Sequence, residues 1–372
     1  MPSEKAHGIQ IAKMCEAFIE AGVDLTLILP TRRGSREPLK SYYGLRVEVK
    51  TVRLWALDWY NGGRLGYAIS SVSFMLSYTL FLWRKKRRKK REGRDFVLYT
   101  VDNDNYSSSL LPLLRLPLFS EMHGAKPRTL AQRMLFHGMR GIIAINRIIE
   151  SELRARFPSS PARYIVEPNG VDPEAFPDMD KKEARTKLGL PQEVPLVLYA
   201  GRFFEWKGLE ILPRAALLSP AIRWQTVGGD EAHFKDFVAE PLPPNLFFAG
   251  SRPHSEIPLW LAAADALLVL GTKRDIQSYR YTSPMKLFEY LAARRSIIAS
   301  KTPALMEIVS AREVIWYEPD VAQDLARQAR FAAAHSLEVT MRIEATARMA
   351  KTRSWKLRAE RILAFMTELS HA

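Results

Sequence analysis

The sequence predicts an α/β protein built from two Rossmann-like domains that face a central cleft. Short, continuously apolar runs alternate with longer amphipathic stretches, and this pattern occurs twice along the chain. Continuous apolar runs are typical of strands that are covered on both faces. Alternation of strand and helix is typical of parallel sheets in α/β layers. Ligands of such sheets bind at the carboxyl ends of the strands, so we expect the functional residues there.

The expected strands form two series, separated by a seam near residues 172–193. Those of the first half are 25–29, 96–100, 116–120, 141–145 and 163–167. Those of the second half are 195–200, 222–227, 245–250, 265–270, 296–300 and 313–317. Only "MPSEKA" precedes the first helical pattern, which begins around residue 7. A doubly wound domain opens with a strand, so we expect the first strand to be missing from this start or to lie upstream of it.

The composition fits a protein of the reducing cytosol. The chain has 372 residues, enough for two domains, and 47% of them are hydrophobic. Its single cysteine, Cys15, excludes a disulfide framework. The first residues contain no apolar core region, so we expect no signal peptide.

The positive charge is concentrated in one place. The net charge is +15, and eight of these charges come from the uninterrupted basic run 84–91. The run follows the uncharged stretch 66–83. It is open to interpretation as a nucleic-acid arm, the flank of a membrane span, a membrane-surface patch or a solvated helix end.

The second half contains a candidate site for a diphosphate. In "VLYAGRFFEWKGLEIL" (197–212) a buried strand runs into Gly201, which permits a tight turn. Arg202 and Lys207 then place two cations at the mouth of a helix, where backbone N–H groups already favour an anion. The residue order excludes a Walker A loop. The alternative is a βα turn with surface cations.

A second segment, "YTSPMKLFEYLAARRSIIAS" (281–300), continues this site. Ser283 and Pro284 are expected to begin a helix as N-cap and first residue. Glu289 lies about one and a half turns further on, where a carboxylate can accept both hydroxyls of a ribose; the alternative is a glutamate paired with an arginine. Upstream, a strand ends in Gly228 and Gly229, which allow close approach of the backbone to a ligand.

With these motifs the chain resembles the retaining, nucleotide-sugar-dependent glycosyltransferases of family 4, which have the GT-B fold. The resemblance covers nearly the whole length. It is carried by "AHGIQIAKMCEAFIEAG" (6–22), "FSEMHG" (119–124), "PNGVD" (168–172), "GRFFEWKG" (201–208), "PHSEIPLWLAAADALLVL" (253–270), "SPMKLFEYLA" (283–292) and "SWKLRAERILAF" (354–365).

The resemblance implies a division into domains. Residues 1–175 would form an acceptor-binding Rossmann-like domain, with its first strand missing. Residues 176–352 would form the nucleotide-sugar-binding domain. Residues 353–372 would form a terminal helix that packs back on the first domain.

The resemblance also implies roles for individual residues. Arg202 and Lys207 would neutralise the leaving nucleoside diphosphate, Glu289 would bind the ribose, and His123 would contact the donor sugar. Gly8, in the first loop, would let the backbone approach the phosphate or sugar. The other donor-binding residues would be Gly201, Gly228, Gly229, Ser283, Pro284, Met285 and Lys286.

One position departs from the family pattern. Members with two glutamates have a second acid eight residues before the ribose-binding one, and that position is Tyr281 here, so the identity of the donor sugar is open. The seven histidines (7, 123, 137, 233, 254, 335 and 371) show no ligand spacing, so we expect no metal site. We also expect no cofactor, because the nucleotide-sugar is a substrate.

The alternative to a sugar-binding role for His123 is a loop histidine that is only hydrogen-bonded locally.

The expected function is transfer of a sugar from a UDP- or GDP-sugar to an acceptor, for which we favour a lipid-linked saccharide in bacterial surface-polysaccharide assembly. The basic run (Arg84, Lys85, Lys86, Arg87, Arg88, Lys89, Lys90 and Arg91) would then attract the protein to the anionic inner face of the cytoplasmic membrane. An inactive relative or scaffold is the main alternative. A nucleic-acid-binding protein is less favoured, because no stacking platform accompanies the charge, and so is a membrane span, because it would separate halves of one domain.

Overall fold

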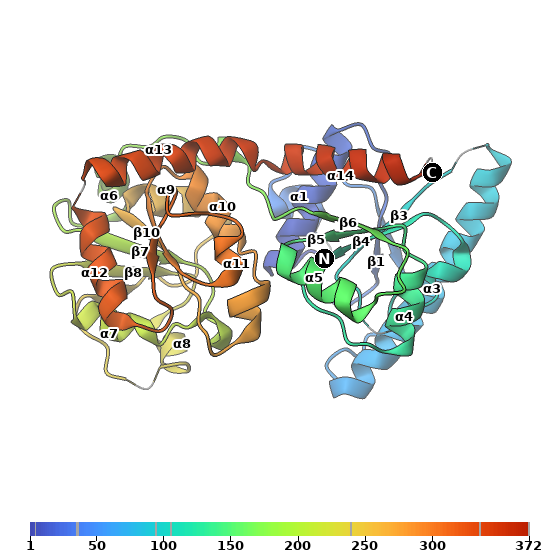
Figure 1. Cartoon of the computed structure of the whole chain (residues 1–372), viewed down its shortest axis with the longest axis horizontal. Coiled ribbons are helices and arrows are strands. Elements are labelled where there is room, and N and C mark those ends of the chain that lie inside the picture. Colours follow the sequence, from blue (N-terminus) through green and yellow to red (C-terminus); the bar gives the residue numbers. More distant parts are fainter. Residues whose placement is uncertain are drawn as a thin grey trace. The chain divides into compact units, whose positions relative to one another are not determined.

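The protein divides into two compact domains. The computed structural model describes residues 1–3, 5–34, 37–93, 95–104, 106–238, 240–334 and 336–370. Met1–Pro168 and Trp355–Ala372 form the first domain, and Asn169–Ser354 form the second (Figure 1). All eleven predicted strands are present, and a further strand, β2, was not predicted. The prediction of an α/β fold is therefore confirmed.

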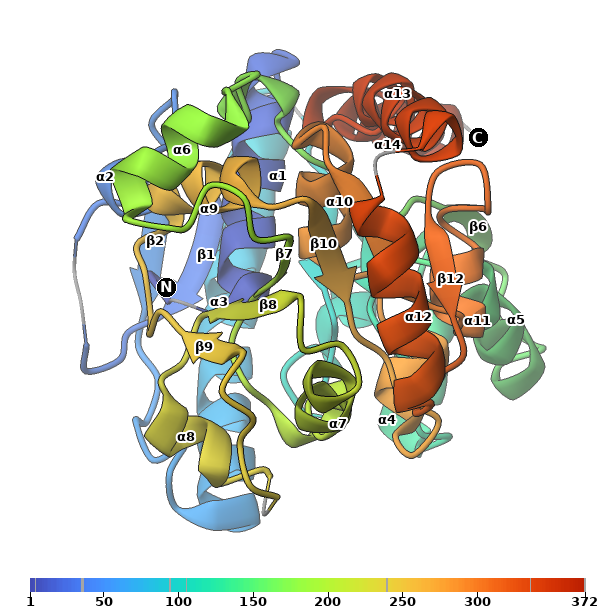
Figure 2. The ribbon, with the colours of Figure 1, turned by 90° about the vertical axis from the view of Figure 1, so that its left-hand side faces the viewer.

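The second domain is built on one parallel sheet of six strands. Its order is β12-β11-β10-β7-β8-β9, and Figure 2 labels β7, β8, β9, β10 and β12. The strands are β7 (Leu196–Ala200), β8 (Arg223–Val227), β9 (Leu246–Phe248), β10 (Ala266–Val269), β11 (Ser296–Ser300) and β12 (Ile315–Tyr317). The strand order reverses beside β7 and β10, where the chain crosses from one half of the sheet to the other. This is the position at which α/β sheets bind their ligands.

Helices cover both faces of this sheet. One face packs against α6 (Lys181–Leu188), α9 (Ile257–Ala263), α10 (Met285–Ala292) and α13 (Leu337–Thr352). The other packs against α7 (Ile211–Leu217), α8 (Glu231–Lys235) and α12 (Ala322–Ala333). The strands are therefore buried on both sides, which explains their continuously apolar sequences.

The first domain contains two parallel sheets. The smaller pairs β1 (Leu27–Pro30) with β2 (Thr51–Leu54). The larger has the order β3-β4-β5-β6 and comprises β3 (Leu98–Val101), β4 (Leu118–Met122), β5 (Gly141–Ala144) and β6 (Arg163–Val166). Among the described residues that precede the first helix, α1 (Ala6–Glu20), none lies in a strand.

The last helix, α14 (Trp355–Ser370), packs along α1 within the first domain (Figure 1). The ring of Phe365 on α14 lies 6.3 Å from that of Phe119 on β4. Gly141 on β5 leaves room for this pair, since a Cβ there would lie within 3 Å of both rings. The remaining helices of the domain are α2 (Leu39–Tyr43), α3 (Gly63–Arg91), η1 (Leu111–Leu114), α4 (Leu130–His137) and α5 (Arg147–Arg156).

The uncharged stretch 66–83 and the basic run 84–91 lie in one continuous helix, α3, which has 29 residues. Within the described ranges it is the one helix that is long and apolar enough to cross a membrane, with a mean hydropathy of 1.5 over its most apolar window. One side of it is fixed to the first domain. Ser73 Oγ accepts a hydrogen bond from the Leu57 N–H at 2.9 Å, and Ser70 Oγ accepts one from the Trp59 N–H at 3.0 Å.

Candidate functional site

The turn after β7 brings glycine backbone and cations together. Gly201 has φ 147°, a conformation that favours glycine. A Cβ on Gly228 would lie 2.5 Å from the Gly201 carbonyl, and a Cβ on Gly229 would overlap the ring of Phe203. The two strand ends therefore touch through glycine backbone. The glycines at this edge of the sheet let the two turns pack on each other. Close approach of the backbone to a ligand stays a prediction.

Lys207 points back into this turn. Its Nζ donates a hydrogen bond to the Arg202 carbonyl at 2.9 Å and lies 4.8 Å from the centre of the Phe204 ring. Burial, and then the neighbouring Arg202 guanidinium, lower the pKa of Lys207 to about 8. Arg202 itself is exposed. Two cations thus lie around one short turn, one in water and one half-buried.

The start of α10 differs from the prediction in one respect. The helix begins at Met285, and Pro284 occupies the N-cap position with no side-chain capping bond. Ser283 is not the N-cap. It is buried, its Oγ accepts a hydrogen bond from the Asn169 N–H at 3.3 Å, and its carbonyl accepts one from Asn169 Nδ2 at 2.7 Å. Ser283 therefore fixes the "PNG" turn to the start of α10, which leaves helix N–H groups of α10 without a capping side chain.

Glu289 lies on the same helix and has a histidine partner. Its Oε1 lies 3.1 Å from His254 Nε2, and its side chain is 17% exposed. His254 belongs to the short helix η4 (His254–Glu256), ahead of α9. The carboxylate is thus reachable by a ligand and already oriented. A pair with histidine replaces the arginine pair considered from the sequence.

In the first domain, a buried carboxylate holds His123. Glu121, on β4, is fully buried, and its Oε1 lies 2.8 Å from His123 Nε2. It accepts further hydrogen bonds from Gln10 Nε2 at 2.7 Å and from the Tyr99 hydroxyl at 2.5 Å. His123 follows the carboxyl end of β4, as predicted, and its side chain is 18% exposed.

Arg358 on α14 balances the charge of Glu121. Its Nη2 lies 2.9 Å from Glu121 Oε1, and it also donates to the carbonyls of Glu167 and Pro168. Burial alone would raise the pKa of Glu121, but the Arg358 guanidinium and the hydrogen bond to His123 outweigh it and hold the pKa far below its usual range. The residue that orients His123 is therefore an anion at neutral pH.

Gly8 lies in a different setting from the one expected. It is in the first turn of α1, not in a loop, and a Cβ there would lie 2.7 Å from the Tyr43 hydroxyl. Its small size is required by packing against α2. The neighbouring His7 faces His123, with ring centres 5.5 Å apart, and burial followed by the proximity of His123 lowers the pKa of His7.

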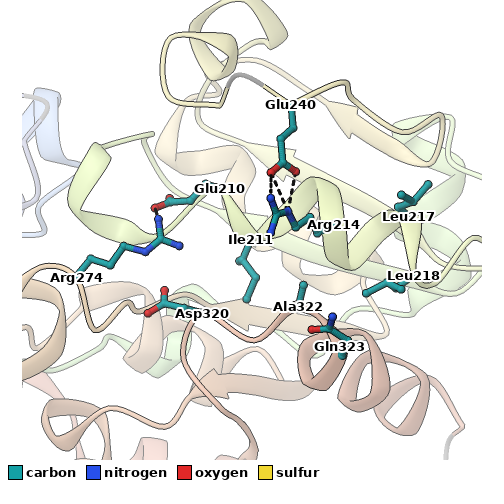
Figure 3. Close-up of a pocket in the computed structure, with 10 residues that line it drawn as sticks. All are labelled: Glu210, Ile211, Arg214, Leu217, Leu218, Glu240, Arg274, Asp320, Ala322 and Gln323. Carbon is teal, nitrogen blue, oxygen red and sulfur yellow. Dashed lines mark hydrogen bonds and ion pairs between the residues drawn. The ribbon is translucent and has the colours of Figure 1, made fainter.

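No cluster of three metal-ligating side chains is found within the described ranges, and His335 and His371 lie outside them. A separate cavity of about 450 Å³ lies between α7 and α12 (Figure 3). Its two arginines are already paired, Arg274 with Glu210 at 2.8 Å and Arg214 with Glu240 at 2.5 Å. The cavity is therefore poorly suited to an anion.

Comparison with known proteins gives a family match within the second domain and fold matches for the whole chain. Residues 180–349 match the family "Glycosyl transferases group 1". This match covers most of the second domain. The matched range contains every candidate residue of the second domain, from Gly201 to Glu289.

Among curated relatives, the D-inositol 3-phosphate glycosyltransferase of Stackebrandtia nassauensis is 36% identical over 86 residues. That match covers 21% of this chain and 19% of the relative, so the chain aligns with about a fifth of the relative's length.

Solved structures match the whole chain. Sucrose-phosphate synthase from Thermosynechococcus elongatus has a TM-score of 0.76 at 18% identity, over 99% of this chain and 94% of that one. Anabaena Alr3699/HepE, solved in complex with UDP and glucose, has a TM-score of 0.69 at 18% identity, over 98% and 97%. The predicted GT-B fold is therefore confirmed.

The structure adds residues that the sequence interpretation did not single out. His254 holds Glu289, Asn169 holds Ser283, and Glu121 with Arg358 holds His123. Glu121 was within the motif "FSEMHG", so its spacing of two from His123 was a usable signal. Arg358 lies 237 residues from Glu121, and no local pattern connects them.

We expect the pair Glu121–Arg358 to be essential for the stability of the first domain. Glu121→Gln leaves a buried guanidinium without its counter-ion and should lower the free energy of unfolding by about 3–5 kcal/mol. The double variant with Arg358→Met removes both charges and should recover much of that loss. Urea unfolding followed by circular dichroism measures this.

The matched control is the exposed pair Glu183–Lys187, where Lys187→Met should change the free energy of unfolding by less than about 1 kcal/mol. A loss in Glu121→Gln no larger than in this control would show that the buried pair is not important for stability.

Proposed function

We propose that the protein is a retaining glycosyltransferase of family 4 that transfers a sugar from a UDP- or GDP-sugar to an acceptor. The observation that carries the proposal is the Gly201 turn with its two cations, in the same domain as an oriented carboxylate, Glu289. The group 1 family match supports it. So does the shared fold with Alr3699/HepE, which was solved with UDP and glucose.

The proposed roles follow from charge. Transfer leaves negative charge on the departing nucleoside diphosphate, and Arg202, Lys207 and the first N–H groups of α10 would stabilise it. Glu289, oriented by His254, would accept hydrogen bonds from the ribose hydroxyls. Gly201, Gly228, Gly229, Pro284 and Met285 would line the nucleotide-sugar with backbone.

We propose that the leaving phosphate itself accepts the proton of the acceptor, with attack on the same face that it leaves. Cationic side chains and backbone dipoles would carry out the charge stabilisation without a metal ion. In the first domain, His123 would contact the donor sugar through the ring nitrogen that does not face Glu121. Its fixed bond to Glu121 supports this, because it sets the orientation of the ring.

We further propose that α3 brings the enzyme to a lipid-borne acceptor at the inner face of the cytoplasmic membrane. One side of α3 is fixed to the first domain, while Leu76, Leu80 and Trp83, spaced four and three residues apart, are 56%, 47% and 41% exposed. This apolar row leads into the basic run. Such a helix lies in the membrane interface rather than across it.

The contacts of α3 indicate which of its cations are available to bind anionic lipid headgroups. Lys86 Nζ donates to the Leu114 carbonyl at 2.6 Å, so it is partly used within the domain. Arg87 lies over the Trp83 ring at 3.6 Å, and Arg88 is near Glu92. Arg84, Arg87, Arg88 and Arg91 are exposed. A lipid-linked saccharide in surface-polysaccharide assembly fits a helix of this kind.

Donor binding is tested with a thermal-stability panel of UDP, GDP and ADP and their sugars. We expect one nucleotide to raise the melting temperature. We expect the corresponding nucleotide-sugar to be turned over even in the presence of EDTA, which removes metal ions. Stabilisation without any turnover would support an inactive relative. No stabilisation by any nucleotide, with salt-sensitive retardation of RNA or DNA, would contradict the proposal and favour the nucleic-acid alternative.

Replacing Arg202 or Lys207 by Ala should lower kcat by about a hundredfold to a thousandfold, because each removes a charge aimed at the leaving group. Lys187→Ala, an exposed cation of the same domain, is the control and should leave kcat unchanged. Equal losses in all three variants would remove the support for a specific role.

Membrane docking is tested by flotation with vesicles of phosphatidylglycerol and phosphatidylcholine. Changing Arg84, Arg87, Arg88 and Arg91 to Gln should weaken binding at least tenfold at low salt, since each cation near an anionic surface contributes roughly 1 kcal/mol. The control replaces four exposed cations of the second domain, Lys182, Lys187, Lys235 and Arg348, and should bind like wild type. Unchanged binding in the α3 variant would contradict docking through α3.

A further inference from the structure

Lys286 has a buried amine with no hydrogen-bond partner among the described residues. It is the second residue of α10, and its Nζ lies 3.6 Å from the centre of the Tyr199 ring. A Cβ built on Gly201 would lie 2.5 Å from this nitrogen, so the amine sits directly against the turn after β7.

Two other buried cations of the protein each form an ion pair with a carboxylate. Arg185 lies 2.7 Å from Asp265, and Arg358 lies 2.9 Å from Glu121. Leaving a buried polar group without partners costs free energy, which is why buried cations are normally paired. An amine needed only for its aliphatic chain could be replaced by methionine without that cost. The position of Lys286 therefore points to a partner that arrives from outside.

The charged groups around Lys286 indicate the sign of that partner. Tyr199 faces it from β7, Lys207 from η3 (Glu205–Lys207), and Glu289 from its own helix. Burial, and then Lys207, lower the pKa of Lys286 well below its usual value, although Glu289 opposes this. Burial raises the pKa of Tyr199, so its ring is a neutral phenol. Two amines with lowered pKa values thus lie around one glycine turn, an arrangement that favours an anion.

We propose that Lys286 binds the diphosphate of the nucleotide-sugar from beneath the Gly201 turn and takes up a proton from water as the phosphate arrives. This inference rests on the proposed function and extends it. Burial lowers the pKa of the amine in the free protein. The proton that it takes up makes it an ammonium that donates to a phosphate oxygen, and the proton returns to water when the nucleoside diphosphate leaves. The charge therefore exists while the phosphate is present, including the moment at which its negative charge grows.

The proposal predicts proton uptake that depends on Lys286. Calorimetric titrations with UDP and GDP at pH 7.5, in two buffers of different ionisation enthalpy, measure the protons bound per nucleotide. For each nucleotide bound, we expect the wild-type protein to take up as much as about one proton more than Lys286→Met. Protons released by the nucleotide itself are the same in both proteins and cancel in the difference.

Affinity gives a second readout. Lys286→Met should bind the nucleotide about tenfold to a hundredfold more weakly, as expected for a lost hydrogen bond to a charged group. Wild-type affinity should fall as the pH rises from 7 to 9, because the protonated amines bind the anion and the pKa of Lys207 is about 8 in the free protein. This fall should be shallower in Lys286→Met, where one of the two titrating amines is absent.

Thermal melts separate this role from a structural one. Without nucleotide, Lys286→Met should melt at or above the wild-type temperature, because it removes an unpaired buried amine. With nucleotide, its stabilisation should be smaller than that of wild type. Lys286→Gln is a second variant in case methionine disturbs packing, and Lys187→Met is the control, which should behave as wild type in every measurement.

The outcomes distinguish this inference from the function on which it rests. If wild type binds a nucleotide and Lys286→Met and Lys286→Gln bind it with the same affinity and proton uptake, the role of Lys286 is wrong and the transferase proposal stands. If wild type binds no nucleoside diphosphate, both are wrong.

Discussion

The candidate donor site depends on the absence of side chains where β7 and β8 end. Gly201 and Gly228 meet backbone to backbone, and the space that a side chain on Gly201 would fill is occupied by the amine of Lys286. Any larger residue at either position would force the two turns apart and displace that amine. The cations of the turn, the start of α10 and the carboxylate of Glu289 are arranged around this contact. The chemistry proposed for the second domain therefore follows from a packing constraint.

Two buried ionisable groups, Glu121 and Lys286, are held in opposite ways. In the first domain, Glu121 is balanced by Arg358 and satisfied by donors on several sides, which fixes the orientation of His123. Such a network orients a side chain and does not call for a ligand. In the second domain, Lys286 is buried with only an aromatic ring beneath it. This difference indicates that Glu121 stabilises the fold and that Lys286 is suited to bind an anion.

The terminal helix α14 contributes to the first domain through more than apolar packing. Arg358 reaches Glu121 and the carbonyls at the end of β6, and Arg361 pairs with Glu167 at 2.7 Å. These contacts connect the last residues of the chain with the strand end that carries His123. A change in α14 is therefore expected to affect His123 as well as stability.

The strands could be predicted from the sequence because burial on both faces makes them continuously apolar. β2 was missed because its residues, "TVRL", are only half-buried and include Arg53, so no apolar run marks it. The residues of the candidate donor site could be singled out because a strand end, a glycine turn and cations are adjacent in the chain. What could not be predicted depends on contacts between distant segments: Asn169 binding Ser283, His254 orienting Glu289, and Arg358 reaching Glu121. A helical end of the stretch 66–83 was one of the interpretations of the basic run, and the structure has one helix over Gly63–Arg91. The hydrogen bond from Lys86 to the Leu114 carbonyl could not be predicted.

The most direct test of the account is a crystal structure of the protein with the nucleoside diphosphate that stabilises it most. We expect a phosphate oxygen within about 3 Å of Lys286 Nζ, as a charge-assisted hydrogen bond requires, and the ribose hydroxyls hydrogen-bonded to Glu289. A nucleotide whose phosphates lie away from the Gly201 turn, for example in the cavity between α7 and α12, would contradict it.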